Sequence, residues 1–198
     1  FGAQFEDISF NRYPDGSITF VNSYPSPNNP NNPPNLPTNP TIIINEFLAS
    51  SFSCCDNGAG DTTDYIELFN YGSETIDIAG LVVEDEDGDY NMIPFGYEET
   101  IMEAGDFLVL WLDGQAELGP LHLASVVGLE NFGEDLFIYD VDFVTVVDLV
   151  SPDYQFKNIS YGRYPDGSET WYHMHPNHGI ANPPPPEVEP PSILINEF

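Results

Sequence analysis

The sequence has 198 residues, with 33 Asp and Glu against only 3 Lys and Arg, and a formal net charge of −30. Hydrophobic residues make up 41% and aromatic residues 14% of the chain, which is enough for a core and excludes a wholly disordered protein. The three cations, Arg12, Lys157 and Arg163, are too few for the basic patch that nucleic acid or an anionic membrane surface requires. No run approaches the ~20 apolar residues of a membrane span, so membrane insertion is not expected either.

Residues 1–24 are predicted to be the C-terminal part of a preceding repeat. The run Phe5–Ser17 recurs as Phe156–Ser168, 151 residues later. When residues 5–47 are aligned with 156–198, 20 of the 43 positions are identical without a gap, which is too many for chance. Solenoid units have roughly 20–50 residues, so this longer period indicates whole domains in a tandem array. We therefore expect the sequence to be an internal stretch of a longer protein.

Two Pro-rich stretches are predicted to link the repeats. Residues 25–41 consist almost entirely of Pro and Asn, and the corresponding residues 176–192 include the run Pro183–Pro186. Such sequences favour an extended polyproline II conformation of about 3.1 Å per residue, which acts as a semi-rigid spacer. The linkers are thus expected to hold neighbouring domains apart, and residues 193–198 to form the first strand of the next repeat.

Between the linkers, residues 42–175 are predicted to form one complete all-β domain. Apolar and β-branched runs alternate with clusters of Gly, Pro, Asn and Asp, and no segment of helical length keeps an apolar period of 3.6 residues. Many short strands separated by turn residues in this way are typical of a β-sandwich. The predicted strands are 42–49, 64–70, 81–86, 90–94, 106–112, 135–140, 143–150 and 158–163.

Cys54 and Cys55 are adjacent and are the only cysteines of the sequence. Two free thiols at the end of a strand, a vicinal disulfide that stiffens the loop, and a cross-link to another chain all remain open. A zinc site is excluded because no second pair of ligands lies at a suitable spacing.

Two acidic loops are candidate calcium sites. In one of them Asp85, Asp87 and Asp89 alternate around a Gly bend, so that their carboxylates can converge on a hard cation. The run lacks the downstream bidentate Glu of an EF-hand, and a solvated hairpin turn at Asp87-Gly88 is the alternative. Calcium is the only cofactor that the sequence suggests. The second, weaker candidate comprises Asp56, Asp61 and Asp64.

The sequence contains no motif for catalysis. A G-x-S-x-G elbow, an H-E-x-x-H helix and a phosphate-binding loop are all absent from it. His173, His175 and His178 are close enough in sequence to bind a transition metal, but they have no histidine counterparts one repeat earlier. We therefore expect no enzymatic activity.

Five short motifs follow one another along the predicted domain, namely Ile43–Phe47, Asp64–Asn70, Ile76–Leu81, Ala104–Leu110 and Ser160–Gly167. In this order they resemble the lamin tail domain, over roughly residues 42–175. The resemblance implies an immunoglobulin-like β-sandwich. The lamin rod is absent and Pro-rich spacers stand in its place, which is similar to the bacterial and archaeal secreted members of that family found in large surface or extracellular proteins.

Several residues of these motifs are expected to have structural roles. Asn45 and Glu46 are predicted to close the first strand, where their side chains accept hydrogen bonds from loop amides. Glu67 lies in the middle of a strand and is predicted to contact Arg163, because a buried carboxylate must be paired. Tyr164–Gly167 is predicted to form a turn with Pro at its second position and Gly167 at its fourth.

The sequence thus predicts a secreted structural repeat of a filament, stalk or surface fibre, whose partners are other copies of the same repeat. Either one covalent string is the fibre, or domains of several strings pack side by side. Two other functions remain open. One is an adhesive module for glycan, mineral or a partner cell, which uses exposed Tyr, Phe, Trp111 or Trp171; the other is a non-catalytic appendage of a secreted hydrolase.

Overall fold

The computed structural model describes residues 9–12, 15–18, 20–23, 26–28, 30–31, 40–124 and 127–187. These residues form an all-β structure, as predicted, and contain no α-helix. Two 3-10 turns, η1 (Glu98–Thr100) and η2 (Ala116–Leu118), lie in the loops. The expected first strand of a next repeat, residues 193–198, lies outside the described residues.

The larger sheet has five antiparallel strands in the order β13-β12-β3-β4-β9. The register between β3 and β4 shifts between Ile44 and Glu46. This bulge at Asn45 changes which residues of β3 face the core, so that both Ile44 and Phe47 belong to it. The strands are β3 (Ile42–Leu48), β4 (Tyr65–Asn70), β9 (Phe107–Trp111), β12 (Ser160–Arg163) and β13 (Trp171–Met174).

The second sheet has four antiparallel strands in the order β11-β10-β6-β7. A short pair, β5 (Ile76–Asp77) and β8 (Ile101–Met102), forms a sheet of its own. The four strands are β6 (Val82–Asp85), β7 (Tyr90–Met92), β10 (Leu136–Tyr139) and β11 (Val146–Val150).

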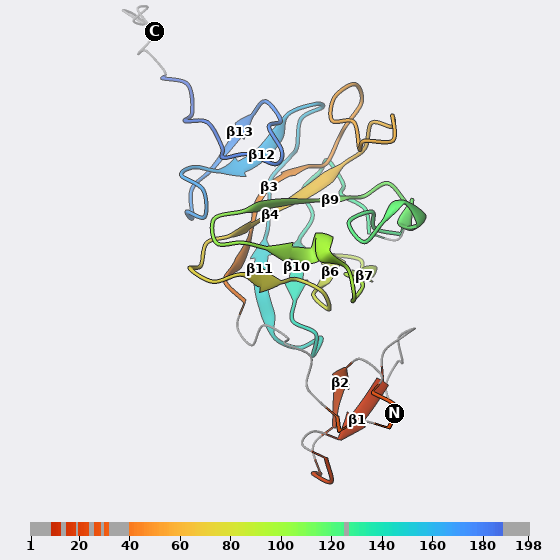
Figure 1. Ribbon diagram of the computed structural model, residues 1–198. Helices are drawn as coiled ribbons and strands as arrows, with labels where there is room; N and C mark the ends of the chain where they lie inside the picture. Colours follow the sequence, from red (N-terminus) through yellow and green to blue (C-terminus); the bar gives the residue numbers. More distant parts are fainter. Residues whose placement is uncertain are drawn as a thin grey trace, which may run out of the picture.

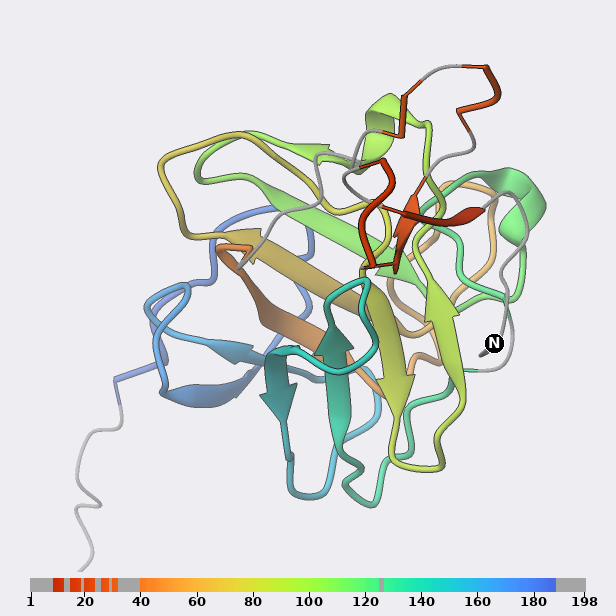
Figure 2. The same cartoon turned by 90° about the horizontal axis from the view of Figure 1, so that it is seen from below.

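The two larger sheets share one apolar core, with β3 and β4 in one layer and β6, β10 and β11 in the other (Figures 1 and 2). Ile44 and Leu68 of the first sheet and Val83 and Ile138 of the second are all 0% exposed. Full burial of each such side chain contributes about 1.5–3 kcal/mol to stability. The arrangement is compatible with a β-sandwich. We call the described residues from 40 to 187 the two-sheet body.

All eight predicted strands are present, with ends that differ from the predicted ones by up to three residues. Strand β13 was not predicted, because the run Trp171–Met174 has no β-branched residue and is soon followed by Pro. Strands β5 and β8 are two residues long, which is too short to show a period.

A separate hairpin precedes the two-sheet body. Strand β1 (Ser9–Arg12) pairs with β2 (Phe20–Ser23), and Arg12 lies opposite Phe20. Strands β12 and β13 pair in the same register 151 residues later. The sequence identity between these two segments is thus accompanied by the same strand pairing.

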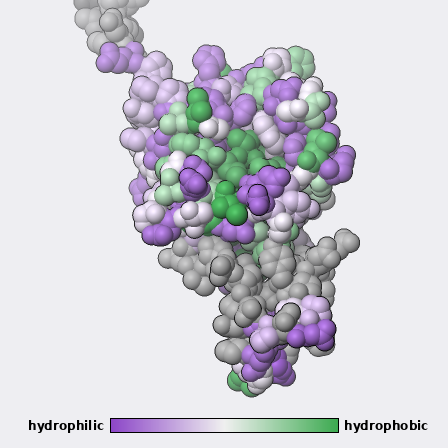
Figure 3. All heavy atoms as spheres, viewed as in Figure 1, coloured by the Kyte–Doolittle hydropathy of each residue, from purple (hydrophilic) through white to green (hydrophobic). Residues whose placement is uncertain are grey.

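The surface of the body is mostly polar, but it exposes some large apolar side chains. Hydrophobic residues gather at the centre of the face seen in Figure 3, with hydrophilic residues around them. Among the most exposed apolar side chains are Phe132 and Val144, both 77% exposed, and Phe52 at 67%. Exposed apolar groups of this size are available for contacts with other molecules.

Candidate functional site

Two glutamates are buried on the outer face of the five-stranded sheet. Glu46 of β3 lies opposite Glu67 of β4, and both are 0% exposed. Glu67 points away from the core because its neighbours Ile66 and Leu68 belong to the core. Glu46 reaches the same face because the bulge at Asn45 shifts the alternation of β3.

A segment after β13 covers the two glutamates, and we call this segment, residues 176–182, the strap. The backbone N–H of Asn177 donates to Oε1 of Glu46 (3.3 Å), and that of Gly179 donates to Oε2 of Glu67 (2.5 Å). The buried hydroxyl of Tyr65 donates to the same Oε1 of Glu46. The two carboxyl groups therefore hold the strap on the sheet.

The strap also places an aromatic side chain on the sheet. The imidazole ring of His178 packs 5.0 Å from the ring of Tyr65 and 5.1 Å from that of Trp111. Burial lowers the pKa of His178, so the ring is neutral at pH 7. Of the three histidines considered as metal ligands, this one acts as an apolar contact.

Asn182 fastens the end of the strap. Its backbone N–H donates to Oδ1 of Asp166 (2.9 Å), and its Nδ2 donates to the carbonyl oxygens of Arg163 (2.9 Å) and Asn45 (3.3 Å). Nδ2 of Asn45 also donates to Oδ1 of Asp166 (3.0 Å), and Oδ1 of Asn45 accepts from the N–H of Gly167 (3.0 Å). We call these five residues the latch. It joins the first strand, the last hairpin and the strap of the two-sheet body.

The latch has a counterpart at the first hairpin. The backbone N–H of Asn31 donates to Oδ1 of Asp15 (3.1 Å), and its Nδ2 donates to the carbonyl oxygen of Arg12 (3.1 Å). The guanidinium of Arg12 donates to the carbonyl oxygen of Ser17. Each residue lies 151 positions before its equivalent. The same contacts join Asn182, Asp166, Arg163 and Ser168 in the body.

The strap lies in the region for which the sequence predicts a linker. Its hydrogen bonds show that the packed unit extends past residue 175 to Asn182. The Pro-rich run proper begins at Pro183. No sequence signal separates the strap from that run, because both lack the alternation of a strand.

Burial controls the charge of the glutamate pair. It raises the pKa of Glu67 to about 8, against the hydrogen bond from Asn45, and the charge of Glu46 raises it further. Burial also raises the pKa of Glu46, although Tyr65 and Asn177 donate hydrogen bonds to it. Two facing buried carboxyl groups do not both ionise readily. At neutral pH the pair therefore retains a proton, and Oε2 of Glu46 has no hydrogen-bond partner among the described residues.

The predicted contact between Glu67 and Arg163 is wrong. Arg163 pairs with Asp148 of the second sheet (Nη2 to Oδ2, 3.2 Å) and lies 4.5 Å over the ring of Trp171. Its Nε donates to the carbonyl oxygen of Ile44 (2.7 Å). Arg163 thus faces the space between the sheets, whereas Glu67 faces outwards.

Asn45 and Glu46 do accept hydrogen bonds from loop amides, as predicted, but they lie in the interior of β3 rather than at its end. The turn after β12 is shifted by one residue. The N–H of Ser168 donates to the carbonyl oxygen of Pro165 (2.9 Å), which places Pro165 first in the turn. Gly167 has a φ of 71°, and a Cβ there would lie 3.3 Å from the ring of Phe69. Both features favour glycine at this position.

The first acidic loop forms the β6–β7 hairpin. Asp85 is 4% exposed, and its carboxylate accepts hydrogen bonds from the N–H groups of Asp89 (3.0 Å) and Gly128 (3.2 Å). Asp87 and Asp89 lie exposed in the turn. Asp85 therefore stabilises the hairpin.

The second acidic loop lies between β3 and β4. The carboxylate of Asp56 accepts a hydrogen bond from the N–H of Gly58 (2.7 Å) in the same loop. Asp61 accepts from the side chain of Gln115 (3.0 Å), and Asp64 accepts from the N–H of Ser51 (2.6 Å). Burial raises the pKa of Asp64 to about 6. Among the described residues, no three His, Cys, Asp or Glu side chains converge as metal ligands. Calcium at either loop remains a prediction.

Cys54 and Cys55 lie in the same loop as free thiols, with their Sγ atoms 2.7 Å apart. Cys55 has a φ of 66°, which is unusual for a residue other than Gly. Burial, together with the neighbouring Cys54, raises the pKa of the Cys55 thiol. The Cys55 thiol is therefore mostly protonated and a poor nucleophile at neutral pH.

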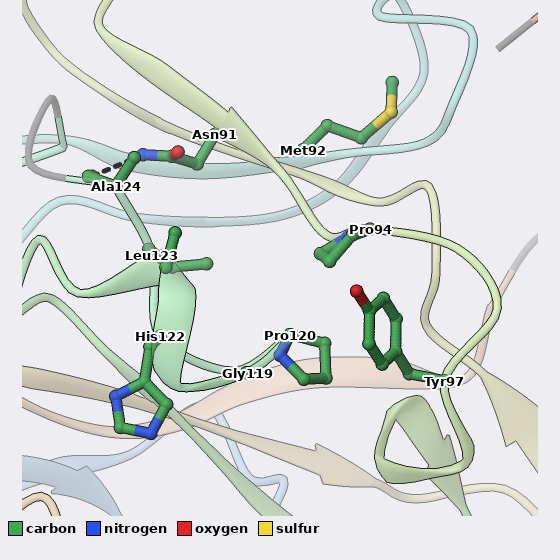
Figure 4. Close-up of a pocket in the computed structure, with 10 residues that line it drawn as sticks. Asn91, Met92, Pro94, Tyr97, Gly119, Pro120, His122, Leu123 and Ala124 are labelled. Atoms are coloured by element: carbon green, nitrogen blue, oxygen red, sulfur yellow. Dashed lines mark hydrogen bonds between the residues drawn. The ribbon is translucent and has the colours of Figure 1, made fainter. Parts of the chain in front are cut away.

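One small pocket near η2 contains a histidine that the sequence did not single out (Figure 4). Nδ1 of His122 lies 2.6 Å from Oδ2 of Asp113, which also accepts from Asn57 (2.8 Å). Burial alone raises the pKa of Asp113, but these hydrogen bonds hold it below its usual value. The imidazole points away from Pro120 and Tyr97, and no described Ser, Cys or Lys lines the pocket. This pair therefore fixes a loop rather than activating a nucleophile.

No family model matches the sequence, and no curated protein matches it. No helix in the described part of the chain is long and apolar enough to cross a membrane.

Proposed function

We propose that the chain is a stretch of an extracellular array of structural repeats, in a filament, stalk or surface fibre without catalytic activity of its own. Each repeat is then an immunoglobulin-like β-sandwich that resembles the lamin tail domain, and Pro-rich segments space the repeats. One observation carries this proposal. The hairpin and its latch occur twice, 151 residues apart, with the same register and the same side-chain contacts.

The path of the chain supports a role under tension. Strand β3 starts at the lower end of the body, and the Pro-rich stretch after the strap leaves at the upper end (Figure 1). The latch connects Asn45 of β3 directly to Asn182 (3.3 Å). Tension along the string therefore passes from β3 to the strap by two routes. One is the latch, and the other is the set of backbone hydrogen bonds between β3 and its neighbours β12 and β4.

The groups at the candidate site also fit a structural role. The carboxyl groups of Glu46 and Glu67 are covered by the strap and accept hydrogen bonds from Tyr65, Asn45 and backbone N–H groups. A general acid or base must reach a substrate. These acids are fully buried, so they serve to position the strap.

Single-molecule stretching of the chain by its two ends tests this function. We expect one cooperative event for residues 42–182, with a contour gain of roughly 450 Å. The variant Asn182→Asp should unfold at a lower force, because it removes the donor that joins the strap to β3. Equal forces for both proteins would contradict a mechanical role for the latch. Electron microscopy of the native material should show beads at a regular spacing, and isolated globular particles would contradict the array.

An adhesive role is the second candidate, and one surface favours it. Phe132, Tyr154 and Phe156 form a row of exposed rings with successive centroid distances of 5.8 and 5.3 Å. Nearby in sequence, Nζ of Lys157 lies 3.2 Å from the centre of the Phe52 ring. Exposed aromatic rings bind sugars and other apolar surfaces. Binding of the purified chain to glycan-coated beads, lost on Phe132→Ala, would support this role.

A further inference from the structure

A groove runs along the free edge of the five-stranded sheet. Strand β13 is the last strand of that sheet. The groove has a volume of about 560 Å³, and its walls are Tyr172, His173 and Met174 of β13 on one side and Pro183–Pro186 on the other. Tyr172 is 36% exposed. The lining of the groove consists mainly of aromatic, thioether and proline carbon atoms.

The second wall of the groove is held in place by the latch. Pro183 directly follows Asn182, whose side chain is 2.9 Å from the carbonyl oxygen of Arg163. A Cβ on Gly162 of β12 would lie only 2.7 Å from Nδ2 of Asn182 and 3.1 Å from Cε of Met174. The strap end and Met174 thus pack closely on the sheet. The structure therefore already places one proline run of its own across the groove from Tyr172 and Met174.

The groove also lies in a part of the chain without negative charge. Residues 170–186 contain no Asp or Glu, and neither do residues 16–45. All 33 acidic residues lie outside these two stretches. Two copies of a protein with a charge of −30 repel one another, and contact costs least where neither surface carries a carboxylate. No residue that lines the groove is acidic, and no residue of the Pro-rich linker 25–41 is acidic either.

Polyproline segments bind in grooves of this kind. A proline-rich segment in the polyproline II conformation loses little entropy when it docks between aromatic side chains. Asn31 is bonded to the first hairpin and Pro40 is buried in the two-sheet body, so residues 32–39 (Asn-Pro-Pro-Asn-Leu-Pro-Thr-Asn) are the remaining part of the linker. Eight residues in this conformation span about 25 Å.

We propose that the groove binds residues 32–39 of a second copy of the chain. The chain's own linker enters β3 at Ile42, at the opposite end of that strand from β12 residue Ser160 and the groove. A seven-residue strand is about 23 Å long. The groove therefore lies about one strand length from the point where the chain's own linker ends, which favours a linker from another copy. The inference rests on the proposed structural role, and it selects the version in which several strings pack side by side.

A titration with the peptide of residues 32–39 tests the proposal. Added to the isotope-labelled chain, the peptide should shift the NMR signals of Ile159, Tyr172 and Met174. The variant Tyr172→Glu brings a carboxylate into the groove and should weaken binding at least tenfold. Tyr97→Glu, with the same change at a tyrosine that is 47% exposed and lies in the other pocket, should bind as the unchanged chain does.

Peptide variants keep the test valid if a protein variant does not fold. A peptide with Ala at the positions of Pro33, Pro34 and Pro37 should bind at least tenfold more weakly, because it loses the polyproline conformation. Equal binding of both peptides, or no shifts near Tyr172, would overturn the proposal.

Sedimentation separates a second copy from self-binding. Association of the chain should increase with its concentration and should be reversed by the peptide. Shifts caused by the peptide in a chain that stays monomeric at all concentrations would overturn the second-copy assignment. These outcomes do not depend on the stretching experiment, because a single string can carry tension with an empty groove.

Discussion

Asn182 donates hydrogen bonds to three oxygens in a site that excludes water, and it is 5% exposed. In Asn182→Asp, an oxygen replaces Nδ2 and faces the carbonyl oxygens of Asn45 and Arg163, beside the carboxylate of Asp166. A buried charge without a donor costs several kcal/mol. We expect a loss of about 3–5 kcal/mol in the free energy of unfolding, measured by urea denaturation with tryptophan fluorescence.

The matched control for this change is Asn91→Asp. Nδ2 of Asn91 donates a single bond, to the carbonyl oxygen of Ala124 (2.9 Å), at an exposed position. Loss of such a bond costs about 1 kcal/mol. If the two variants lose the same stability, Asn182 is an ordinary surface residue and the latch does not hold the strap.

The glutamate pair predicts an unusual dependence of stability on pH. Burial raises the pKa of Glu67 to about 8 and raises that of Glu46 as well, so between pH 4.5 and 8 the folded state binds more protons than the unfolded state. Stability therefore falls as pH rises through this window, by up to about 1.4 kcal/mol per pH unit for each proton. For Glu67, both states are protonated below this window and both are ionised above it.

The variant Glu46→Gln should flatten this dependence. Its amide oxygen can still accept from Tyr65 and Asn177, and the neutral side chain removes the charge that raises the pKa of Glu67. Glu67 then ionises at lower pH. Free energies of unfolding at pH 5, 6, 7 and 8 should decline less steeply for the variant than for the unchanged chain. Parallel curves would mean that the pair is not the group that titrates.

For single residues, the sequence predicts which side chains have a structural role more reliably than it predicts their contact partners. It singles out Asn45, Glu46, Glu67 and Arg163, and the structure buries all four. The pairing of Glu67 with Arg163 was wrong because a bulge at Asn45 and the side on which each strand packs decide the partner. Neither can be read from strand periodicity, which gives only the alternation along one strand.

Among the elements, β12 and the strap meet at Gly162. A Cβ at this position would lie 2.7 Å from Nδ2 of Asn182. In Gly162→Ala the side chain of Asn182 must shift and its bonds to Arg163 and Asn45 are disturbed, so we expect a loss of about 1–3 kcal/mol in the free energy of unfolding. The strap amides of Asn177 and Gly179 should also exchange with deuterium faster, because their bonds to the glutamates are disturbed.

Gly128→Ala serves as the control for that change. No heavy atom lies within 4 Å of the Cβ that would be added there, and its φ is not positive. The alanine should leave stability unchanged or raise it by a few tenths of a kcal/mol through the unfolded chain. If Gly162→Ala behaves in the same way, the strap does not pack as tightly as its contacts with Met174 and Asn182 indicate.

The elements divide into those that local sequence specifies and those that need the whole fold. The long strands β3, β4 and β9 follow from their apolar and β-branched residues. The strap has no such pattern, because its order comes from hydrogen bonds to Glu46, Glu67 and Asp166, which lie 10 or more residues away in sequence. The repeat offered one signal that was not used: Asn31 and Asn182 are identical, although the five residues before each of them all differ.

For the whole molecule, the charge of −30 sets how it responds to salt. Self-repulsion destabilises the compact state, and the Debye length falls from about 30 Å at 0.01 M to about 8 Å at 0.15 M ionic strength. We expect the free energy of unfolding and the association between copies both to increase with NaCl over this range. Stability that is constant or falls with salt would show that carboxylate repulsion is not a dominant cost of folding.

The same measurement distinguishes screening from a bound cation. At equal ionic strength, CaCl₂ and NaCl screen long-range repulsion to a similar extent, whereas a site at Asp85, Asp87 and Asp89 adds stability that depends on the concentration of free calcium. If calcium binds there, millimolar CaCl₂ should raise the free energy of unfolding above the value in matched NaCl, and Asp87→Asn with Asp89→Asn should abolish the difference. Both residues are exposed and the turn is closed by the Asp85 carboxylate, so the double variant keeps its fold. Coincident curves in the two salts would assign these acids to the hairpin alone.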